Sequence, residues 1–264
     1  MTIDATFTLS DAPARRSGFA ARLGVLVYAV AAYLFFFTAF GLYFPLFVWD
    51  MPAPFTLNGG APTHPVLALA INIGALLVFG VQHSVMARKS FKRTLTRVIP
   101  PAAERATYVL ASTVALLPLI LAWSPMPTTI YSISYAPAYW ALMGLSAAGF
   151  SLLLLSSFMI NHFELFGLLQ AWSFFRQREV TPIPFRTPWL YRVCRHPLML
   201  GVLIFLWATP HMTVGRLVLN LGMTAYILVG LYFEEKDLIA AFGEKYRAYM
   251  KSTPRIIPRL GRRA

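Results

Sequence analysis

Four clusters of polar and titratable side chains border the apolar runs of this chain, and their residue types could support chemistry. The first is Arg195-His196-Pro197, which stands directly before an apolar run. Proline suits the first turn of a helix, so Arg195 and His196 are expected at a helix N-terminus, whose free N–H groups and positive dipole end bind anions. Arginine adds a bidentate grip on a carboxylate. The alternative is a positively charged flank of a membrane span that needs no ligand.

The second cluster is the acidic pair Glu234-Glu235 at the start of the segment 233–249. At 100° per residue, both carboxylates fall on the same side of a helix as the stripe that includes Tyr246. Two carboxylates on the buried face of an amphipathic helix could hold ribose hydroxyls or a cationic group. They could equally form a salt bridge to one of the many arginines, Arg195 among them.

Two further clusters contain histidines. If the helix before Asn161 continues, Asn161 and Glu164 share a face and His162 lies about 100° round, which gives either the polar lining of a substrate pocket or a hydrogen-bonded helix exit. His83 near the end of another apolar run is a candidate base or a histidine satisfied by hydrogen bonds.

Cys194 lies beside Arg195, where a thiol can become nucleophilic, but we interpret it as inert.

Several chemistries are excluded by what the sequence lacks. It has no GxGxxG or P-loop pattern, no HExxH and no Cys-His cluster, and its five histidines show no ligand spacing, so no metal site is predicted. A single cysteine rules out an internal disulfide framework.

The elements that position these clusters are membrane spans. Hydrophobic residues make up 58% of the chain, charged residues 12%, and the mean hydropathy is +0.61. The apolar run 198–233 is too long for one span and is broken at 208–215, so we predict a hairpin there. The expected fold is an all-α polytopic membrane bundle of five to six transmembrane segments, followed by an amphipathic C-terminal helix. The predicted spans are 23–49, 65–87, 106–124, 138–160, 198–209 and 215–233.

Lysine and arginine mark one side of this bundle. Six lie in 88–105 and five in 161–196, whereas 50–64 and 125–137 contain none. By the positive-inside rule both termini, the basic loops and the site face the cytoplasm of a bacterial inner membrane. The formal net charge of +13 is then attractive to anionic lipids, and we predict no nucleic-acid or protein partner. Residues 1–264 are predicted to form one membrane domain, with a polar N-terminus at 1–20 and a core at 190–258.

The C-terminal half resembles the membrane methyltransferases related to isoprenylcysteine carboxyl methyltransferase and phospholipid methyltransferases. The N-terminal half narrows the resemblance to the bacterial methanethiol S-methyltransferases, through QHSVMARKSFKR (82–93), PPAAERATYVL (100–110), NHFELFGL (161–168) and WATPHMTVG (207–215). The similarity runs from about 65 to 258. One departure is Met199, where the family motif RHPxYxG commonly has tyrosine. The ordered motif in the C-terminal half is Arg195-His196-Pro197, Gly201, Glu234-Glu235, Leu238, Phe242-Gly243, Tyr246, Tyr249 and Pro254.

The resemblance implies an S-adenosylmethionine-dependent enzyme that methylates a small thiol. Arg195 and His196 would anchor the methionyl carboxylate, and Glu234 and Glu235 would face the ribose or the amino group. The other implied cofactor-binding residues are Tyr246, which would pack the adenosine, Pro197 and Gly201, which would shape the backbone, and Tyr191.

In the implied reaction a thiolate displaces the sulfonium methyl, so a base must take the thiol proton. Our first candidate base is His162, oriented by Asn161 or Glu164, and the second is His83. Three alternatives remain at this point. The same fold could methylate a prenylcysteine carboxylate or a lipid amine, and the chain could instead be a non-enzymatic membrane protein of the NnrU type.

Overall fold

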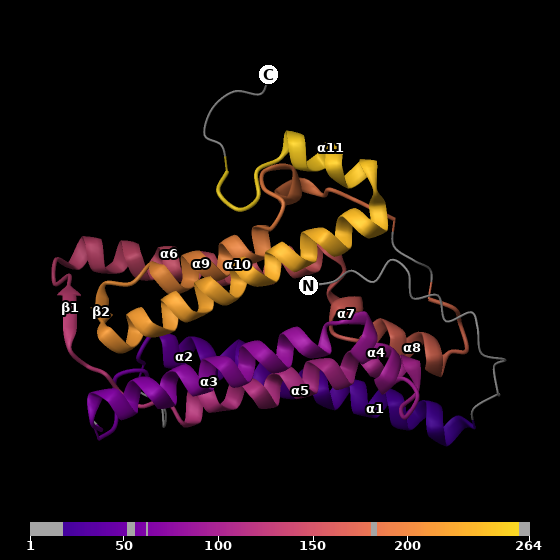
Figure 1. Cartoon of the computed structure of the whole chain (residues 1–264), viewed down its shortest axis with the longest axis horizontal. Helices are drawn as coiled ribbons and strands as arrows, with labels where there is room; N and C mark the ends of the chain where they lie inside the picture. Colours follow the sequence, from indigo (N-terminus) through magenta and orange to yellow (C-terminus); the bar gives the residue numbers. More distant parts are fainter. Residues whose placement is uncertain (1–17, 52–55, 62, 181–183, 259–264) are drawn as a thin grey trace.

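The computed structural model describes residues 18–51, 56–61, 63–180 and 184–258, and these form an elongated helical bundle (Figure 1). Two antiparallel strands, β1 and β2, pair at one end, which we call the ribbon end. The short helices α4, α7, α8 and α11 lie toward the other end, which we call the basic end. The elements are α1 (Phe19–Phe36), the π-helix η1 (Phe37–Tyr43), α2 (Phe44–Val48), α3 (Pro65–Met86), α4 (Lys89–Leu95), α5 (Pro101–Leu121), β1 (Thr129–Ser132), α6 (Ala136–Ile160), α7 (His162–Leu165), α8 (Leu168–Phe175), the 3-10 helix η2 (Trp189–Arg192), α9 (Pro197–Trp207), β2 (His211–Thr213), α10 (Val214–Phe242) and α11 (Glu244–Ser252).

Five of the six predicted membrane spans are confirmed. Among the described residues, five helical segments are long and apolar enough to cross a membrane, and α9 is a shorter apolar helix. The first span is continuous from Phe19 to Val48 and includes the π-helix. The chain is therefore an integral membrane protein with an all-α bundle fold.

The helices form two groups, with α1, α2, α3 and α5 in one and α6, α9 and α10 in the other (Figure 1). Within the second group, α6 and α9 cross at a pair of glycines. A Cβ at Gly149 would lie 2.5 Å from the Phe205 nitrogen, and one at Gly201 would lie 2.6 Å from the Leu153 nitrogen. These glycines let the two backbones approach closely, as small residues do in membrane helix pairs.

The break predicted at 208–215 is confirmed, and it contains strand β2. Thr213 caps α10 by accepting a hydrogen bond from the Arg216 nitrogen at 3.2 Å. β2 pairs with β1, so this ribbon ties the hairpin to the connection before α6.

The C-terminal helix differs from the prediction in one respect. The segment 233–249 was expected to be a continuous amphipathic helix, but α10 ends at Phe242 and α11 begins at Glu244. Gly243 joins them with φ 57°, a left-handed value that glycine adopts at little cost. Glu234 and Glu235 therefore belong to the last turns of the long span α10, and Tyr246 to a separate helix that folds back over them.

Candidate functional site

The segment Arg195-His196 and the acidic pair Glu234-Glu235 meet at the basic end. The Arg195 guanidinium donates to Glu235 Oε1 from Nε at 2.9 Å and from Nη2 at 2.7 Å. Both side chains are buried, with exposed fractions of 8% and 11%. The salt-bridge alternative is thus the arrangement observed for Glu235, and the pair joins the N-terminus of α9 to α10.

Arg195 also holds the chain that follows α11. Its Nη1 donates to the carbonyl oxygens of Thr253 at 2.6 Å and Met250 at 3.2 Å. Its backbone N–H donates to the Pro254 oxygen at 2.8 Å, and that of His196 donates to the Arg255 oxygen at 3.1 Å. The guanidinium therefore acts within the protein as the anchor of this turn.

His196 lies between the two carboxylates. Its Nε2 is 3.2 Å from Glu235 Oε1, and its Nδ1 is 3.9 Å from Glu234 Oε2. On the other side of Glu235, Arg255 Nε is 3.2 Å from Oε2. Two arginines thus face Glu235, whereas Glu234 faces the imidazole. We call Arg195, His196, Glu234, Glu235 and Arg255 the ionic cluster.

Aromatic rings from α11 and the segment before η2 pack beside the ionic cluster. The Phe185 ring centroid lies 6.0 Å from that of Tyr246 and 5.5 Å from that of Tyr249. Tyr246 is 2% exposed, yet its hydroxyl has no hydrogen-bond partner among the described residues. Burial, and the charges of Glu235 and Glu234 after it, raise the pKa of Tyr246, so this phenol stays protonated. A buried hydroxyl without a partner is costly, and a water or a polar ligand would satisfy it.

Tyr191 and the start of α9 complete the surroundings. The Tyr191 hydroxyl donates to the Ser156 oxygen of α6 at 3.4 Å, and its carbonyl accepts a hydrogen bond from the Tyr249 hydroxyl. Pro197 occupies the first turn of α9 as predicted. Gly201 lies against α6, where the structure gives it a packing function.

The two candidate bases lie in different parts of the bundle. His83 of α3 has its Nε2 2.6 Å from the Tyr108 hydroxyl and its Nδ1 3.1 Å from Ser112 Oγ, both on α5. Its ring also contacts the Tyr226 ring of α10 at 5.9 Å. The His83 group therefore contacts α10, the helix that also carries Glu234 and Glu235.

His162 belongs to a different arrangement. Its Nε2 is 2.9 Å from the Tyr33 hydroxyl of α1, and its Nδ1 is 2.8 Å from Ser157 Oγ of α6. Its ring stacks on Phe158 at 3.8 Å. Burial is the cause that lowers the pKa of His162, and no charged group contributes. His162 thus fastens α1 to α6, in contact with the π-helix through the Phe37 ring at 5.6 Å.

Asn161 and Glu164 form a local helix cap. The Asn161 side chain accepts from the Glu164 nitrogen at 3.3 Å and donates to Glu164 Oε2 at 3.0 Å. Burial raises the pKa of Glu164, and Arg105 and Asn161 oppose that rise. These contacts match the hydrogen-bonded helix exit, and they do not orient His162 by a hydrogen bond.

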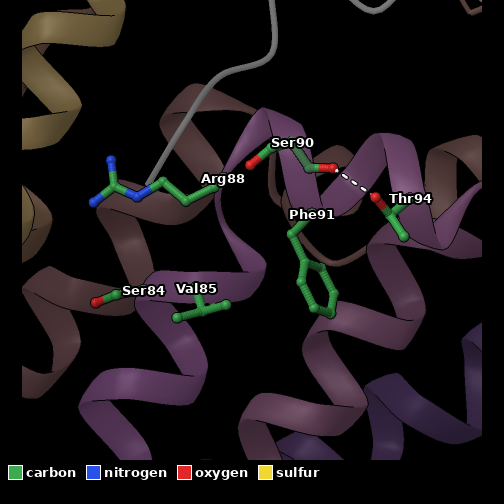
Figure 2. Close-up of a pocket in the computed structure, with 6 residues that line it drawn as sticks. All are labelled: Ser84, Val85, Arg88, Ser90, Phe91 and Thr94. Carbon is green, nitrogen blue, oxygen red and sulfur yellow. Dashed lines mark hydrogen bonds between the residues drawn. The ribbon is translucent and has the colours of Figure 1, made fainter.

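An open depression of about 410 Å³ begins one residue after His83, where α3 ends and α4 starts (Figure 2). Figure 2 shows Phe91 directed toward Val85, with the Arg88 side chain extending away from them. The Arg88 guanidinium lies 4.1 Å from the Phe233 ring, which directly precedes Glu234. The depression therefore lies close to α10. It is lined by Ser84, Val85, Arg88, Ser90, Phe91 and Thr94.

Sequence reasoning missed Tyr108, Tyr226, Phe185 and Arg255. A signal for Tyr108 did exist, because Tyr108 and Ser112 are four residues apart and share one face of a span. The others depend on contacts between distant segments.

Comparisons with known proteins identify the family of this chain. The family model described as "NnrU protein" matches residues 71–258. A Bradyrhizobium diazoefficiens protein named "Methanethiol S-methyltransferase 2" is 46% identical, covering 91% of this chain and 92% of the relative. A Mycobacterium tuberculosis protein named "Methanethiol S-methyltransferase" is 46% identical over 88% of this chain and 95% of its own length.

A third relative comes from Crocosphaera subtropica and carries the same name. It is 42% identical and covers 94% of this chain and 97% of its own length. No solved structure matches the chain significantly. The chain belongs to the NnrU family and, within it, to the group whose curated members are named methanethiol S-methyltransferase.

Proposed function

We propose that this protein transfers the methyl group of S-adenosylmethionine to methanethiol and forms dimethyl sulfide, at the cytoplasmic side of the membrane. The observation that carries the proposal is the ionic cluster with the unpartnered Tyr246 hydroxyl beside it, in a chain whose relatives bear that name. The basic end would face the cytoplasm because the Lys-rich and Arg-rich loops lie there.

The residues at this site fit S-adenosylmethionine chemically. The donor carries a sulfonium cation, an ammonium group, a carboxylate and an adenosine. Glu234 would supply negative charge for its cations, beside Glu235, which Arg195 and Arg255 hold in place. The rings of Phe185 and Tyr246 would supply an aromatic surface for the adenine. The Tyr246 hydroxyl would gain the polar partner that it lacks within the protein.

Arg195 and His196 would contribute to the same donor site by fixing the positions of the groups around it. Arg195 fixes Glu235 and the turn at 253–255, so it would position the acidic side of the site. His196 faces Glu234 and would meet the methionyl end of the donor. Tyr191, Pro197 and Gly201 would hold α9 and α6 in the arrangement that this contact requires.

The reaction would bring a thiol sulfur to the sulfonium methyl in an apolar part of the bundle. Charge disappears in this step, so a site that excludes water favours it. A free cysteine thiol, with a pKa of about 8.5, is already mostly protonated at neutral pH, so an alkyl thiol acceptor needs a base. His83 would be that base, because its ring contacts Tyr226 of α10, the helix that carries Glu234, whereas His162, Asn161 and Glu164 would support the fold.

The experiment that tests this function supplies purified full-length protein in lipid nanodiscs with methyl-labelled S-adenosylmethionine and one of three acceptors. The acceptors are methanethiol, a prenylcysteine and phosphatidylethanolamine. Labelled dimethyl sulfide in the headspace, with no labelled ester or amine, is the expected result. Label only in the prenylcysteine ester or the lipid would replace the thiol with that acceptor. No labelled product from any acceptor would contradict a methyltransferase.

A further inference from the structure

We propose that Tyr108 is a catalytic residue that contacts the acceptor thiol and passes its proton to His83, with Ser112 positioning the imidazole. This inference rests on the proposed function and adds the path of the proton.

Hydrogen bonds connect Tyr108, His83 and Ser112 in a row. Tyr108 Oη lies 2.6 Å from His83 Nε2, and His83 Nδ1 lies 3.1 Å from Ser112 Oγ. The relay uses the tautomer in which Tyr108 donates to Nε2 and the Nδ1–H group donates to Ser112 Oγ. Both ring nitrogens of His83 are occupied. An external proton therefore reaches Nε2 through the Tyr108 oxygen, which still has a lone pair to offer.

The surroundings of the pair suit a small apolar acceptor. The rings of Phe79 and Tyr226 lie 5.4 and 5.9 Å from the His83 ring, and Tyr108 is 8% exposed. His83 itself is half-buried, so part of its side chain is accessible. A Cβ on Gly80 would lie 3.3 Å from the Tyr226 ring, so α3 and α10 are already close here. A thiol with one or two carbons fits such a place better than a prenyl group or a lipid headgroup.

Groups on two helices surround this pair. On α5, the Arg105 guanidinium lies 5.3 Å from the Tyr108 ring centroid. On α10, the Tyr226 ring lies 5.9 Å from the His83 ring, and Glu234 of the same helix would face the cationic methyl donor.

Proton transfer and methyl transfer are coupled in the proposed reaction. The thiol S–H bond breaks and its proton moves to Tyr108 Oη, while the Tyr108 proton moves to His83 Nε2. The freed sulfur electron pair forms the new S–CH3 bond, and the old C–S bond breaks with its electrons remaining on the donor sulfur. The products are a thioether, S-adenosylhomocysteine and an imidazolium, which releases its proton to water.

A matched control exists in the same chain. Tyr33 and His162 form a second tyrosine–histidine pair, with 2.9 Å between Tyr33 Oη and His162 Nε2. This pair holds α1 against α6 and α7 and has no electrostatic contribution from a charged group. Tyr33→Phe removes the same hydroxyl from the same kind of hydrogen bond as Tyr108→Phe.

The test compares Tyr108→Phe, Tyr33→Phe and the unchanged protein in nanodiscs. Tyr108→Phe should lower kcat/KM for methanethiol on the order of 10²- to 10⁴-fold, the usual contribution of a general base, and leave the Kd of S-adenosylmethionine unchanged. Its remaining rate should rise at alkaline pH, where the free thiol ionises. Tyr33→Phe should keep the normal rate. Equal rates and pH profiles for the two variants would overturn the proposal.

A second measurement does not depend on turnover. Ethanethiol is titrated into protein loaded with sinefungin, an unreactive cationic analogue of the donor, and the ultraviolet absorbance of bound thiolate is recorded at neutral pH. The unchanged protein and Tyr33→Phe should show thiolate, Ser112→Ala less, and Tyr108→Phe none. Thiolate in Tyr108→Phe would overturn the relay. An unchanged protein that makes no dimethyl sulfide would instead contradict the proposed function, so the two failures are distinguishable.

Discussion

Arg195 and Glu235, 40 residues apart in the chain, are joined by two hydrogen bonds from one guanidinium to one carboxylate oxygen. A single buried ion pair thus fixes the start of α9 against the last turns of α10. Because Arg195 also binds the Thr253 carbonyl, the position of α11 depends on the same guanidinium. The site and the fold of the C-terminal part therefore share this pair.

Glu235→Gln should destabilise the protein, because it leaves Arg195 and Arg255 facing a neutral amide in a buried place. Removing one partner of a buried pair costs about 3–5 kcal/mol of unfolding free energy. Glu244→Gln is the control, since that side chain is 88% exposed and pairs with Arg247 on the surface. Its cost should be below about 0.5 kcal/mol. Thermal unfolding in detergent compares them, and equal Tm values would contradict a structural role for the pair.

The α6–α9 crossing predicts a difference between two glycines on one helix. Gly149→Ala places a Cβ 2.5 Å from the Phe205 nitrogen, so the backbones must separate, at a cost of about 1–3 kcal/mol. Gly144→Ala meets no atom within 4 Å. We expect a lower Tm for the first variant alone. A similar loss in both would show that close packing does not decide stability here.

The pKa of His162 predicts a loss of stability in mild acid. Burial lowers this pKa below its ordinary value of 6.5, so the unfolded chain binds a proton that the folded protein resists. Stability should therefore fall as the pH drops below 6.5. Glu164, whose pKa burial raises above 4.5, acts in the opposite direction. His162→Gln should reduce the fall in Tm between pH 7.5 and pH 5.5, and an unchanged fall would refute this origin.

Cys194 should react slowly with alkylating reagents. Burial raises the pKa of its thiol, although the hydrogen bond involving the His196 backbone opposes this. The thiolate is the reactive form, so modification of the native protein at neutral pH should be much slower than that of free cysteine. Intact-mass measurement with iodoacetamide follows the rate, and the denatured protein is the control. Rapid labelling of the native protein would indicate an activated cysteine.

The spans were predictable from the sequence because hydropathy and the break at 208–215 act locally. The same holds for the two charged elements at Arg195 and Glu235, whose residue types stand out against apolar neighbours. The resemblance to methyltransferases, seen from about 65 to 258, agrees with the family match over 71–258. The spans, the charged segments and the family motifs can each be recognised from residues that are close together in the sequence.

What the sequence could not provide was the pairing of distant segments. Asn161, His162 and Glu164 are polar residues at the end of a span, and nothing in their neighbourhood along the chain indicated that Tyr33 and Ser157 contact the two ring nitrogens of His162. Gly243 also appeared to continue a helix, whereas its positive φ separates α10 from α11.

Equilibrium binding of tritiated S-adenosylmethionine to the unchanged protein, Glu234→Gln and Glu244→Gln tests the central claim most directly. If the ionic cluster holds the methyl donor, Glu234→Gln should weaken binding at least about tenfold, a free-energy change of about 1.4 kcal/mol. Glu244→Gln should bind like the unchanged protein. Equal affinity in Glu234→Gln, or no binding by the unchanged protein, would contradict the assignment of this site.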